Sequence, residues 1–224
     1  MKRVPEPELM EDPAQARAYA GADFEEPHAR CVALLLERFP ELAEARGEAV
    51  DLGCGPADIA CRVARACPGL RILGVDGAEA MLAEGRARVA REGLGERVLL
   101  RRLRLPDRGG RLPARAFDLV FSNSLLHHLA EPLVLWRETA RLARPGAAVF
   151  VMDLSRPADP AALEALVARY AAGEPEILRR DFAASLRAAY RPEEVRAQLR
   201  RAGLPLQVAP CSDRHWLAWG RLPP

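Results

Sequence analysis

The sequence predicts an α/β fold built on a mostly parallel sheet. Short apolar runs alternate with amphipathic stretches of helical period through the middle of the chain, a pattern typical of strands joined by crossover helices. Half of the 224 residues are hydrophobic and 29% are charged, the balance of a globular chain. This length allows one well-buried domain, so we expect a single unit over residues 1–224.

The repeating part of the chain, residues 47–155, is expected to form the binding core. An N-terminal arm and helix precede it in residues 1–46, where an apolar helical run begins at Pro27. The expected strands cover residues 48–52, 70–75, 97–102, 117–122 and 147–154. The expected helices cover residues 57–67, 78–91 and 133–143. The sequence Arg144-Pro145-Gly146 is expected to stop the last of these helices.

Further elements follow the repeating unit. Residues 160–172 and 176–189 are expected to form two helices of a cap that spans residues 156–190. Residues 191–224 are expected to hold a final helix and a terminal hairpin, with strands at 206–211 and 215–222. Trp216 and Trp219 should point to opposite faces of the second strand, and the spacing of Trp136 favours the core.

Composition excludes several classes of function. The chain has 33 basic and 31 acidic residues, so its net charge provides no general attraction to nucleic acid or an anionic membrane. The basic stretch over residues 101–115 lacks interleaved aromatic residues and is typical of a solvated face. We expect neither a secretory signal nor a membrane span. The five cysteines form no Cys-x-x-Cys pair, which indicates reduced thiols and a cytoplasmic location. The few histidines give no metal-ligand pattern, so no metal is expected.

The most informative segment joins the first expected strand to the first expected helix. It reads VDLGCGP over residues 50–56. Glycines there let the backbone turn tightly and approach a ligand, and amides at a helix start face the ligand as donors. Asp76 ends the second expected strand, where an acid can accept both ribose hydroxyls of a nucleoside. The two features predict a nucleoside site at this edge of the sheet.

From about residue 50 to residue 154 the chain resembles class I S-adenosylmethionine-dependent methyltransferases of the small-molecule type. The segments that match, in order, are the glycine loop, Asp76, the strand and turn from Phe117 to Leu129, and Arg144-Pro145-Gly146-Ala147. The resemblance implies a Rossmann-like three-layer sandwich with seven strands and an antiparallel final strand. It also implies S-adenosylmethionine as the cofactor and a small-molecule methyl acceptor, which the sequence does not identify. The oligomeric state is open.

The resemblance also implies which residues hold the cofactor. Asp51 would face its methionine end and Asp76 its ribose. The other implied contacts are Gly53, Cys54, Gly55, Gly77, Met81, Leu103, Arg104, Leu105, Asn123 and Tyr19. The chain departs from the family at two places. Ala57 stands where many members have a third glycine, and no acid follows the third strand near the adenine amine, which leaves backbone groups of residues 103–105 or Asp107.

His128 and Asp153 are the candidate catalytic residues. His127 and His128 follow the fourth expected strand, where an acceptor would meet the methyl group. We expect His127 to pack at the start of a helix, whereas packing and catalysis are equally compatible with His128. Asp153 ends the fifth expected strand at the same edge. Displacement at a sulfonium methyl needs alignment and desolvation, and a base only if the acceptor loses a proton.

Three other functions share part of this sequence pattern. A nicotinamide-dependent oxidoreductase needs a small residue at the sixth place of the glycine fingerprint, where this chain has Asp58. A non-catalytic S-adenosylmethionine-binding regulatory protein would keep the same glycine loop. An RNA methyltransferase acting on carbon or oxygen stays open. Methylation of a base amine is disfavoured because Ser122-Asn123-Ser124-Leu125 lacks the two prolines and the aromatic residue typical of such enzymes.

Overall fold

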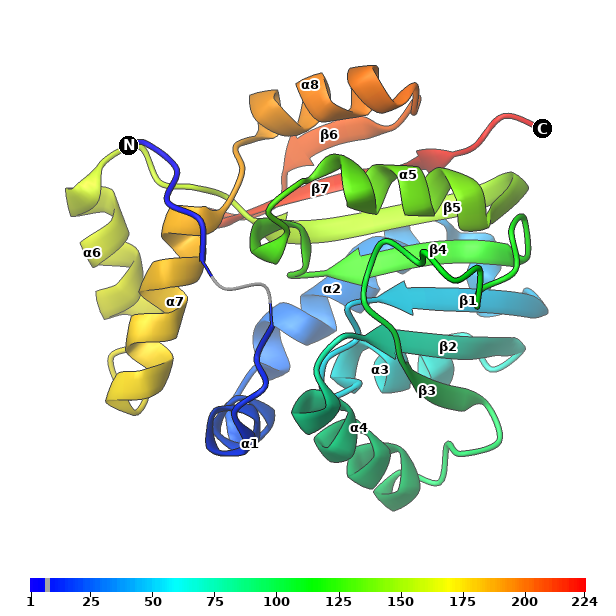
Figure 1. The fold of residues 1–224 in the computed structure, drawn as a ribbon, viewed down its shortest axis with the longest axis horizontal. Coiled ribbons are helices and arrows are strands. Elements are labelled where there is room, and N and C mark those ends of the chain that lie inside the picture. The colour runs from blue at the N-terminus through cyan, green and yellow to red at the C-terminus, as the bar shows by residue number, and fades with distance from the viewer. Residues whose placement is uncertain (7–8) are drawn as a thin grey trace.

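The computed structural model describes residues 1–6 and 9–224, and these form a seven-stranded sheet between two layers of helices (Figure 1). Pro7 and Glu8 of the predicted arm lie outside the described residues. The strand order is β3-β2-β1-β4-β5-β7-β6. Neighbouring strands from β3 to β5 are parallel, β7 is antiparallel to β5, and β6 is antiparallel to β7. The predicted α/β class and its antiparallel final strand are confirmed.

The strands lie close to the predicted ranges, with one exception. They are β1 (Gly47–Leu52), β2 (Leu70–Asp76), β3 (Val98–Arg102), β4 (Phe117–Asn123), β5 (Ala143–Leu154), β6 (Gln207–Pro210) and β7 (His215–Arg221). The exception is β5, which begins before the expected stop signal instead of after it. Gly146 has a φ of +75°, and the pairing of β4 with β5 shifts register between Phe117 and Leu119. The segment therefore bends within the sheet rather than leaving it as a loop.

The helices also follow the sequence pattern. They are α1 (Pro13–Gly21), α2 (Glu25–Arg38), η1 (Pro40–Ala43), α3 (Asp58–Ala66), α4 (Glu79–Arg91), η2 (Leu126–His128), α5 (Leu133–Leu142), α6 (Pro160–Tyr170), α7 (Glu176–Ala188) and α8 (Pro192–Ala202). Local chemistry explains several starts. The side chains of Asp12 and Asp159 accept hydrogen bonds from backbone N–H groups in the first turns of α1 and α6, each at 2.8 Å. Each of these helices begins with proline.

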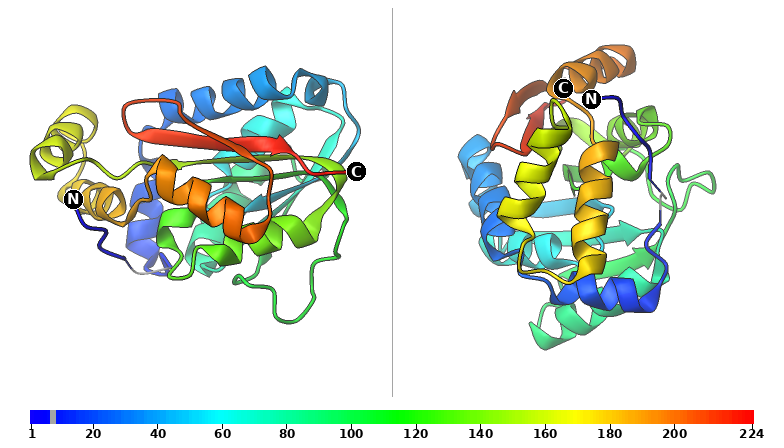
Figure 2. Two further views of the ribbon diagram at one scale, coloured as in Figure 1. Left: turned by 90° about the horizontal axis from the view of Figure 1, so that it is seen from above. Right: turned by 90° about the vertical axis from the view of Figure 1, so that its left-hand side faces the viewer.

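Alternating strand residues pack into two apolar cores on opposite faces of the sheet. The core beneath α2, α3 and α4 takes Leu119 and Phe121 of β4, and the core beneath α5 and α8 takes Val120. Figure 2 shows the two helical layers with the sheet between them. Trp216 lies in the second core and Trp219 packs against the first, which confirms that they point to opposite faces. Trp136 is fully buried, as predicted.

The arm and the cap helices gather at the carboxyl ends of the parallel strands (Figures 1 and 2). α1 packs against α4 and α7, and α6 packs against α7. The first residues run beside α7, where the backbone N–H of Val4 donates to the carbonyl of Arg187 at 3.0 Å. Ligands of open α/β sheets bind at this edge, so the arm and cap cover the expected site. Among the described residues, no helix is long and apolar enough to cross a membrane.

Candidate functional site

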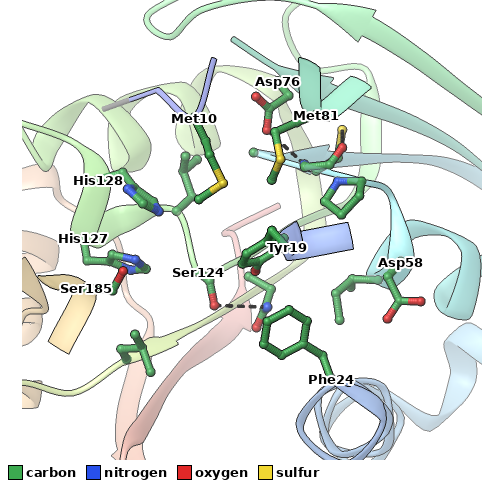
Figure 3. Close-up of a pocket in the computed structure, with 18 of the residues that line it drawn as sticks. Met10, Tyr19, Phe24, Asp58, Asp76, Met81, Ser124, His127, His128 and Ser185 are labelled. Atoms are coloured by element: carbon green, nitrogen blue, oxygen red, sulfur yellow. Dashed lines mark hydrogen bonds between the residues drawn. The ribbon is translucent and has the colours of Figure 1, made fainter. Parts of the chain in front are cut away.

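A cavity of about 410 Å³ lies at the carboxyl ends of β1, β2 and β4, beneath α1 and α7 (Figure 3). This volume is within the range of small-molecule pockets. The cavity is lined by the glycine loop, the ends of β2 and β4, the segment after β3, the arm and the cap. Each of the twelve residues for which the resemblance implies cofactor contact lines it: Asp51, Gly53, Cys54, Gly55, Asp76, Gly77, Met81, Leu103, Arg104, Leu105, Asn123 and Tyr19.

The glycine loop is held close to β2. Gly53 and Gly55 have φ values of +74° and +51°, a region that glycine adopts without steric cost. The backbone N–H groups of Gly53 and Cys54 donate to the carbonyl of Val75 at 2.8 and 3.0 Å. Ala57, which replaces a third glycine, has a φ of +60°, a conformation that costs an L-residue about 1–2 kcal/mol. The glycine loop therefore keeps its left-handed conformation at Ala57, and the alanine there strains the backbone.

Asp76 is anchored by the turn that it faces. Its Oδ2 accepts the backbone N–H of Gly55 at 2.9 Å, and its Oδ1 accepts that of Ala78 at 2.8 Å. Burial raises the pKa of Asp76, although backbone hydrogen bonds oppose the shift. Each carboxylate oxygen can accept a second hydrogen bond. The fixed carboxylate is thus able to accept two neighbouring hydroxyl groups of a ligand.

Two buried acceptors nearby have no donor. Asp51 is 1% exposed, and neither its Oδ2 nor the Oδ1 of Asn123 receives a hydrogen bond from the described residues. Burial, followed by the charge of Asp76, raises the pKa of Asp51 well above its ordinary value. Buried acceptors without partners are costly. A positively charged ligand with N–H donors would remove this cost, so the residues present fit the methionine end of the cofactor implied by the resemblance.

Apolar side chains of the arm line the cavity. The rings of Tyr19 and Phe24 lie 4.8 Å apart, and Phe24 stacks on His28 at 5.1 Å. Figure 3 shows Tyr19, Phe24, Met10 and Met81 around the same space. Burial raises the pKa of Tyr19 to about 12, so its hydroxyl stays protonated at neutral pH. These rings can exclude water from the cavity, and the charges that the same segment brings to its lining are those of Asp23 and Glu26.

The two candidate catalytic residues are placed differently. His128 lines the cavity, but Asp153 does not. Asp153 is 1% exposed, its Oδ2 accepts the backbone N–H of Leu126 at 2.7 Å, and its Oδ1 lies 2.5 Å from Nδ1 of His127. We expected Asp153 to act at the active edge; instead it holds η2 and the His127 ring from behind the cavity wall. His127 is packed at 2% exposure, as expected, yet it also lines the cavity.

The His127–Asp153 pair is electrostatically coupled. Burial alone would lower the pKa of His127, but the charge and hydrogen bond of Asp153, followed by the charge of Glu6, outweigh it and raise the pKa. Burial raises the pKa of Asp153, and the opposing effect of His127 brings it below the ordinary value. Each residue therefore favours the charged form of the other.

The remaining adenine candidate, Asp107, is structural. It does not line the cavity. Its Oδ2 accepts the backbone N–H of Leu112 at 2.7 Å and lies 3.5 Å from the Arg141 guanidinium. Asp107 thus fixes the loop between β3 and β4, which leaves residues 103–105 as the adenine candidates.

Several residues in or beside the cavity were not predicted. Glu6 from the arm lies beside the two histidines, with Oε1 at 3.2 Å from Nδ1 of His128. Ser185 of α7 donates to Oε2 of Glu6 at 3.3 Å, and Arg214 stacks over the ring of Tyr170 at 3.4 Å. No motif marks these residues, because they come from segments remote in sequence. The meeting of His127 with Asp153 was foreseeable, since β4 and β5 are neighbouring parallel strands.

Comparisons with known proteins agree with this geometry. Residues 50–149 match the family model described as a methyltransferase domain. The chain is 33% identical over 137 residues to the trans-aconitate 2-methyltransferase of Methylobacterium radiotolerans, covering 61% of this chain and 48% of the relative. It is 26% identical to the ubiquinone biosynthesis O-methyltransferase of Acinetobacter baumannii, covering 75% and 70%. The chain spans less than half the length of the trans-aconitate relatives that it matches.

The fold has close counterparts among solved structures. The structure of a SAM-dependent methyltransferase from Aquifex aeolicus superimposes with a TM-score of 0.70 at 18% identity, covering 94% of this chain and 98% of the other. At this identity the likeness establishes the shared fold. Residues 50–149 thus match a methyltransferase domain, within a chain that has the fold of an S-adenosylmethionine-dependent methyltransferase.

Proposed function

We propose that this protein binds S-adenosylmethionine in the cavity and transfers its methyl group to a small-molecule acceptor. The observation that carries the proposal is the pair of unsatisfied buried acceptors, Asp51 and Asn123, in the same cavity as the anchored carboxylate of Asp76. The first pair suits an ammonium and sulfonium group, and Asp76 suits ribose hydroxyls. The relatives named for trans-aconitate and for ubiquinone biosynthesis support a small-molecule acceptor.

The chain's own residues would act by alignment and by exclusion of water. The bound cofactor supplies the electrophilic methyl group. Residues 103–105, Gly77 and Met81 surround the expected adenine position, and Tyr19 closes the cavity from the arm. A direct displacement gains most from a dry, aligned site. We further propose that the whole chain works as one unit in which residues 156–190 cap the acceptor.

The acceptor side of the cavity is formed by the cap and by η2. It combines the apolar side chains of Leu178 and Phe182 with the guanidinium of Arg214, which is 8% exposed. His128 faces this space and is the proposed base for an acceptor that must lose a proton. We propose that Asp153 is a positioning residue that acts through His127, because it does not reach the cavity.

Calorimetric titration with S-adenosylmethionine and S-adenosylhomocysteine tests the cofactor proposal. Both should bind the wild type, and NAD should not. Asp76→Ala should weaken both by roughly tenfold to over a hundredfold, because a hydrogen bond to a charged acceptor contributes about 1.5–3 kcal/mol. Absence of binding to the wild type, or binding of NAD instead, would reject the proposal.

The acceptor class needs a separate experiment. Protein incubated with methyl-labelled cofactor should label a small-metabolite fraction and not total tRNA or rRNA at low salt. The six arginines within residues 101–115 are exposed and provide the main basis for an RNA hypothesis, which salt-sensitive labelling of RNA would support. Binding without any label transfer would favour a regulatory protein. Cytoplasmic location stays a prediction, which cell fractionation can test.

A further inference from the structure

A second cluster of reactive side chains lies beside the cavity, where His127 and His128 line the wall and Glu6 packs behind them. Glu6, His127 and His128 each offer one potential ligand atom, and these atoms all lie within 4.8 Å of one another. Figure 3 shows His127 and His128 together at one side of the cavity, away from Asp76 and Met81. Among the described residues this is the single group of three that could hold a metal ion. No sequence motif predicts this group, because Glu6 is remote from the histidine pair along the chain.

The orientation of His127 is set by Asp153. With Nδ1 at 2.5 Å from a buried carboxylate oxygen, the neutral ring carries its proton on Nδ1. The Nε2 lone pair then faces Oε1 of Glu6 at 3.5 Å. The two lone pairs repel each other unless a proton or a metal cation lies between them. Histidines that bind metals commonly donate their other N–H to a carboxylate in this manner.

The separations match metal coordination better than hydrogen bonding. Oε1 of Glu6 lies 3.5 Å from Nε2 of His127 and 3.2 Å from Nδ1 of His128. The first distance is beyond the usual range of an N–H···O hydrogen bond. Zn²⁺ binds nitrogen and oxygen at about 2.0–2.2 Å, so two tetrahedral ligand atoms lie roughly 3.3 Å apart. The two spacings from Oε1 of Glu6 bracket that value, and the spacing between the two histidine atoms is at most 4.8 Å.

The carboxylate of Glu6 has one oxygen available as a metal ligand. Its Oε2 accepts the hydroxyl of Ser185 at 3.3 Å, whereas its buried Oε1 accepts no hydrogen bond. The arm is fixed nearby because the Arg3 guanidinium donates to the carbonyls of Ala188 and His127 at 2.5 and 3.0 Å. The Arg3 guanidinium thus donates to backbone carbonyls and not to Glu6. Oε1 of Glu6 stays directed at the two histidines.

We propose that Glu6, His127 and His128 form a binding site for a divalent transition-metal ion of the Zn²⁺ type, with Asp153 orienting His127. Two imidazoles and one carboxylate leave a coordination position open, as in catalytic metal sites. The ligand set favours Zn²⁺ or Co²⁺ over Mg²⁺, which prefers oxygen. The ion would lie beside the part of the cavity wall formed by His127 and His128. With the ion bound, His128 is a ligand and not a base, and the Lewis acidity of the ion takes over by lowering the pKa of a hydroxyl group that it binds.

Metal binding is tested directly on the full chain after chelator dialysis. Titration with Zn²⁺, in competition with a chromophoric chelator, should show one site per chain, and Co²⁺ should give the visible absorption of a four- or five-coordinate ion. Mg²⁺ in excess should displace neither ion. If the wild type binds neither Zn²⁺ nor Co²⁺ stoichiometrically, the proposal is overturned. A proton shared between these side chains would then explain their short separations.

Matched variants locate the ion. Glu6→Gln should weaken Zn²⁺ binding by roughly 100-fold or more, and Asp153→Asn by about 10–100-fold, the usual effect of losing a carboxylate that orients a ligand. Glu11→Gln removes an exposed carboxylate of the same arm that pairs with Arg102, so it should bind Zn²⁺ as the wild type does. Equal affinity in Glu6→Gln and Glu11→Gln overturns the site.

Folding must be checked because Asp153 is buried. If circular dichroism shows that Asp153→Asn is unfolded, Glu6→Gln and His128→Asn test the site instead. The His128 side chain is 23% exposed, so its replacement should leave the protein folded. The proposal does not rest on the proposed methyl transfer. Failure to bind S-adenosylhomocysteine would reject that function while leaving the metal titration unaffected, and the reverse holds for loss of the metal.

Discussion

Asp51→Asn should separate a binding role from a structural one, because the two roles predict opposite effects. Asparagine keeps the shape of the side chain and removes its charge. Asp51 is 1% exposed, and its Oδ2 receives no hydrogen bond from the described residues. The folded protein without ligand therefore gains little from the charge, and the free energy of unfolding should stay unchanged or rise. Affinity for S-adenosylmethionine should fall.

The size of the affinity loss follows from the burial. A hydrogen bond to a charged group contributes about 1.5–3 kcal/mol. Burial raises the pKa of Asp51, so part of this free energy is used to ionise the carboxyl group when a cationic ligand binds. We therefore take the lower half of the range, about 1.5–2 kcal/mol, which corresponds to roughly a 10- to 30-fold increase in Kd.

The pH dependence provides a second measurement of the same effect. An acid with a raised folded pKa favours folding at low pH, and the contribution is lost as pH rises from the unfolded pKa through the folded one. Cofactor affinity of the wild type should increase over that interval as the carboxylate forms. The Asp51→Asn protein should lack this increase.

Calorimetry and chemical denaturation measure the two quantities, with Asp118→Asn as the control. Asp118 lies near the other end of β4, outside the cavity, and pairs with Arg144. The Asp118→Asn substitution should change the free energy of unfolding but not the affinity for S-adenosylmethionine. The reasoning is refuted if Asp51→Asn binds as tightly as the wild type, or if it loses stability by more than about 1 kcal/mol.

Three further predictions concern acid sensitivity, the glycine turn and closure. Burial opposes ionisation of Asp58, but hydrogen bonds from His28 and Arg62 outweigh it and lower its pKa to about 2; about 2 kcal/mol of stability should be present above pH ~3.8 and be lost as pH falls toward ~2. Denaturation across this interval should show the loss in the wild type, and an unchanged acid slope in Asp58→Asn would contradict the assignment. Gly53→Ala should lower the free energy of unfolding by at least about 1–2 kcal/mol, because φ is +74° and the new Cβ would lie 2.7 Å from a Leu125 methyl carbon. In the control Gly95→Ala the new Cβ meets no atom within 4 Å, so the melting temperature should stay nearly unchanged. Similar losses of stability in both variants would contradict this explanation. S-adenosylhomocysteine should slow hydrogen exchange in α1 and α7, and unchanged exchange in both helices would exclude a closing role.

Much of the fold was predictable because its signals are local. The period of the apolar residues identifies strands and helices, and the glycine loop with Asp76 lies within one strand-turn-helix-strand unit. The structure brings these residues to one cavity. The start of β5 was wrongly predicted because Arg144-Pro145-Gly146 carries a stop signal for a helix, whereas pairing with β4 decides whether the chain stays in the sheet.

The sequence by itself determined the α/β class, the glycine turn and the residues expected around the cofactor, since each depends on neighbours along the chain. Only the tertiary structure decided which side chains meet beside the cavity. Glu6 meets His127 because the arm packs along α7, and Asp153 is withdrawn from the cavity because η2 folds over it. Such contacts depend on how separate elements pack, and no local pattern of residue types specifies that packing.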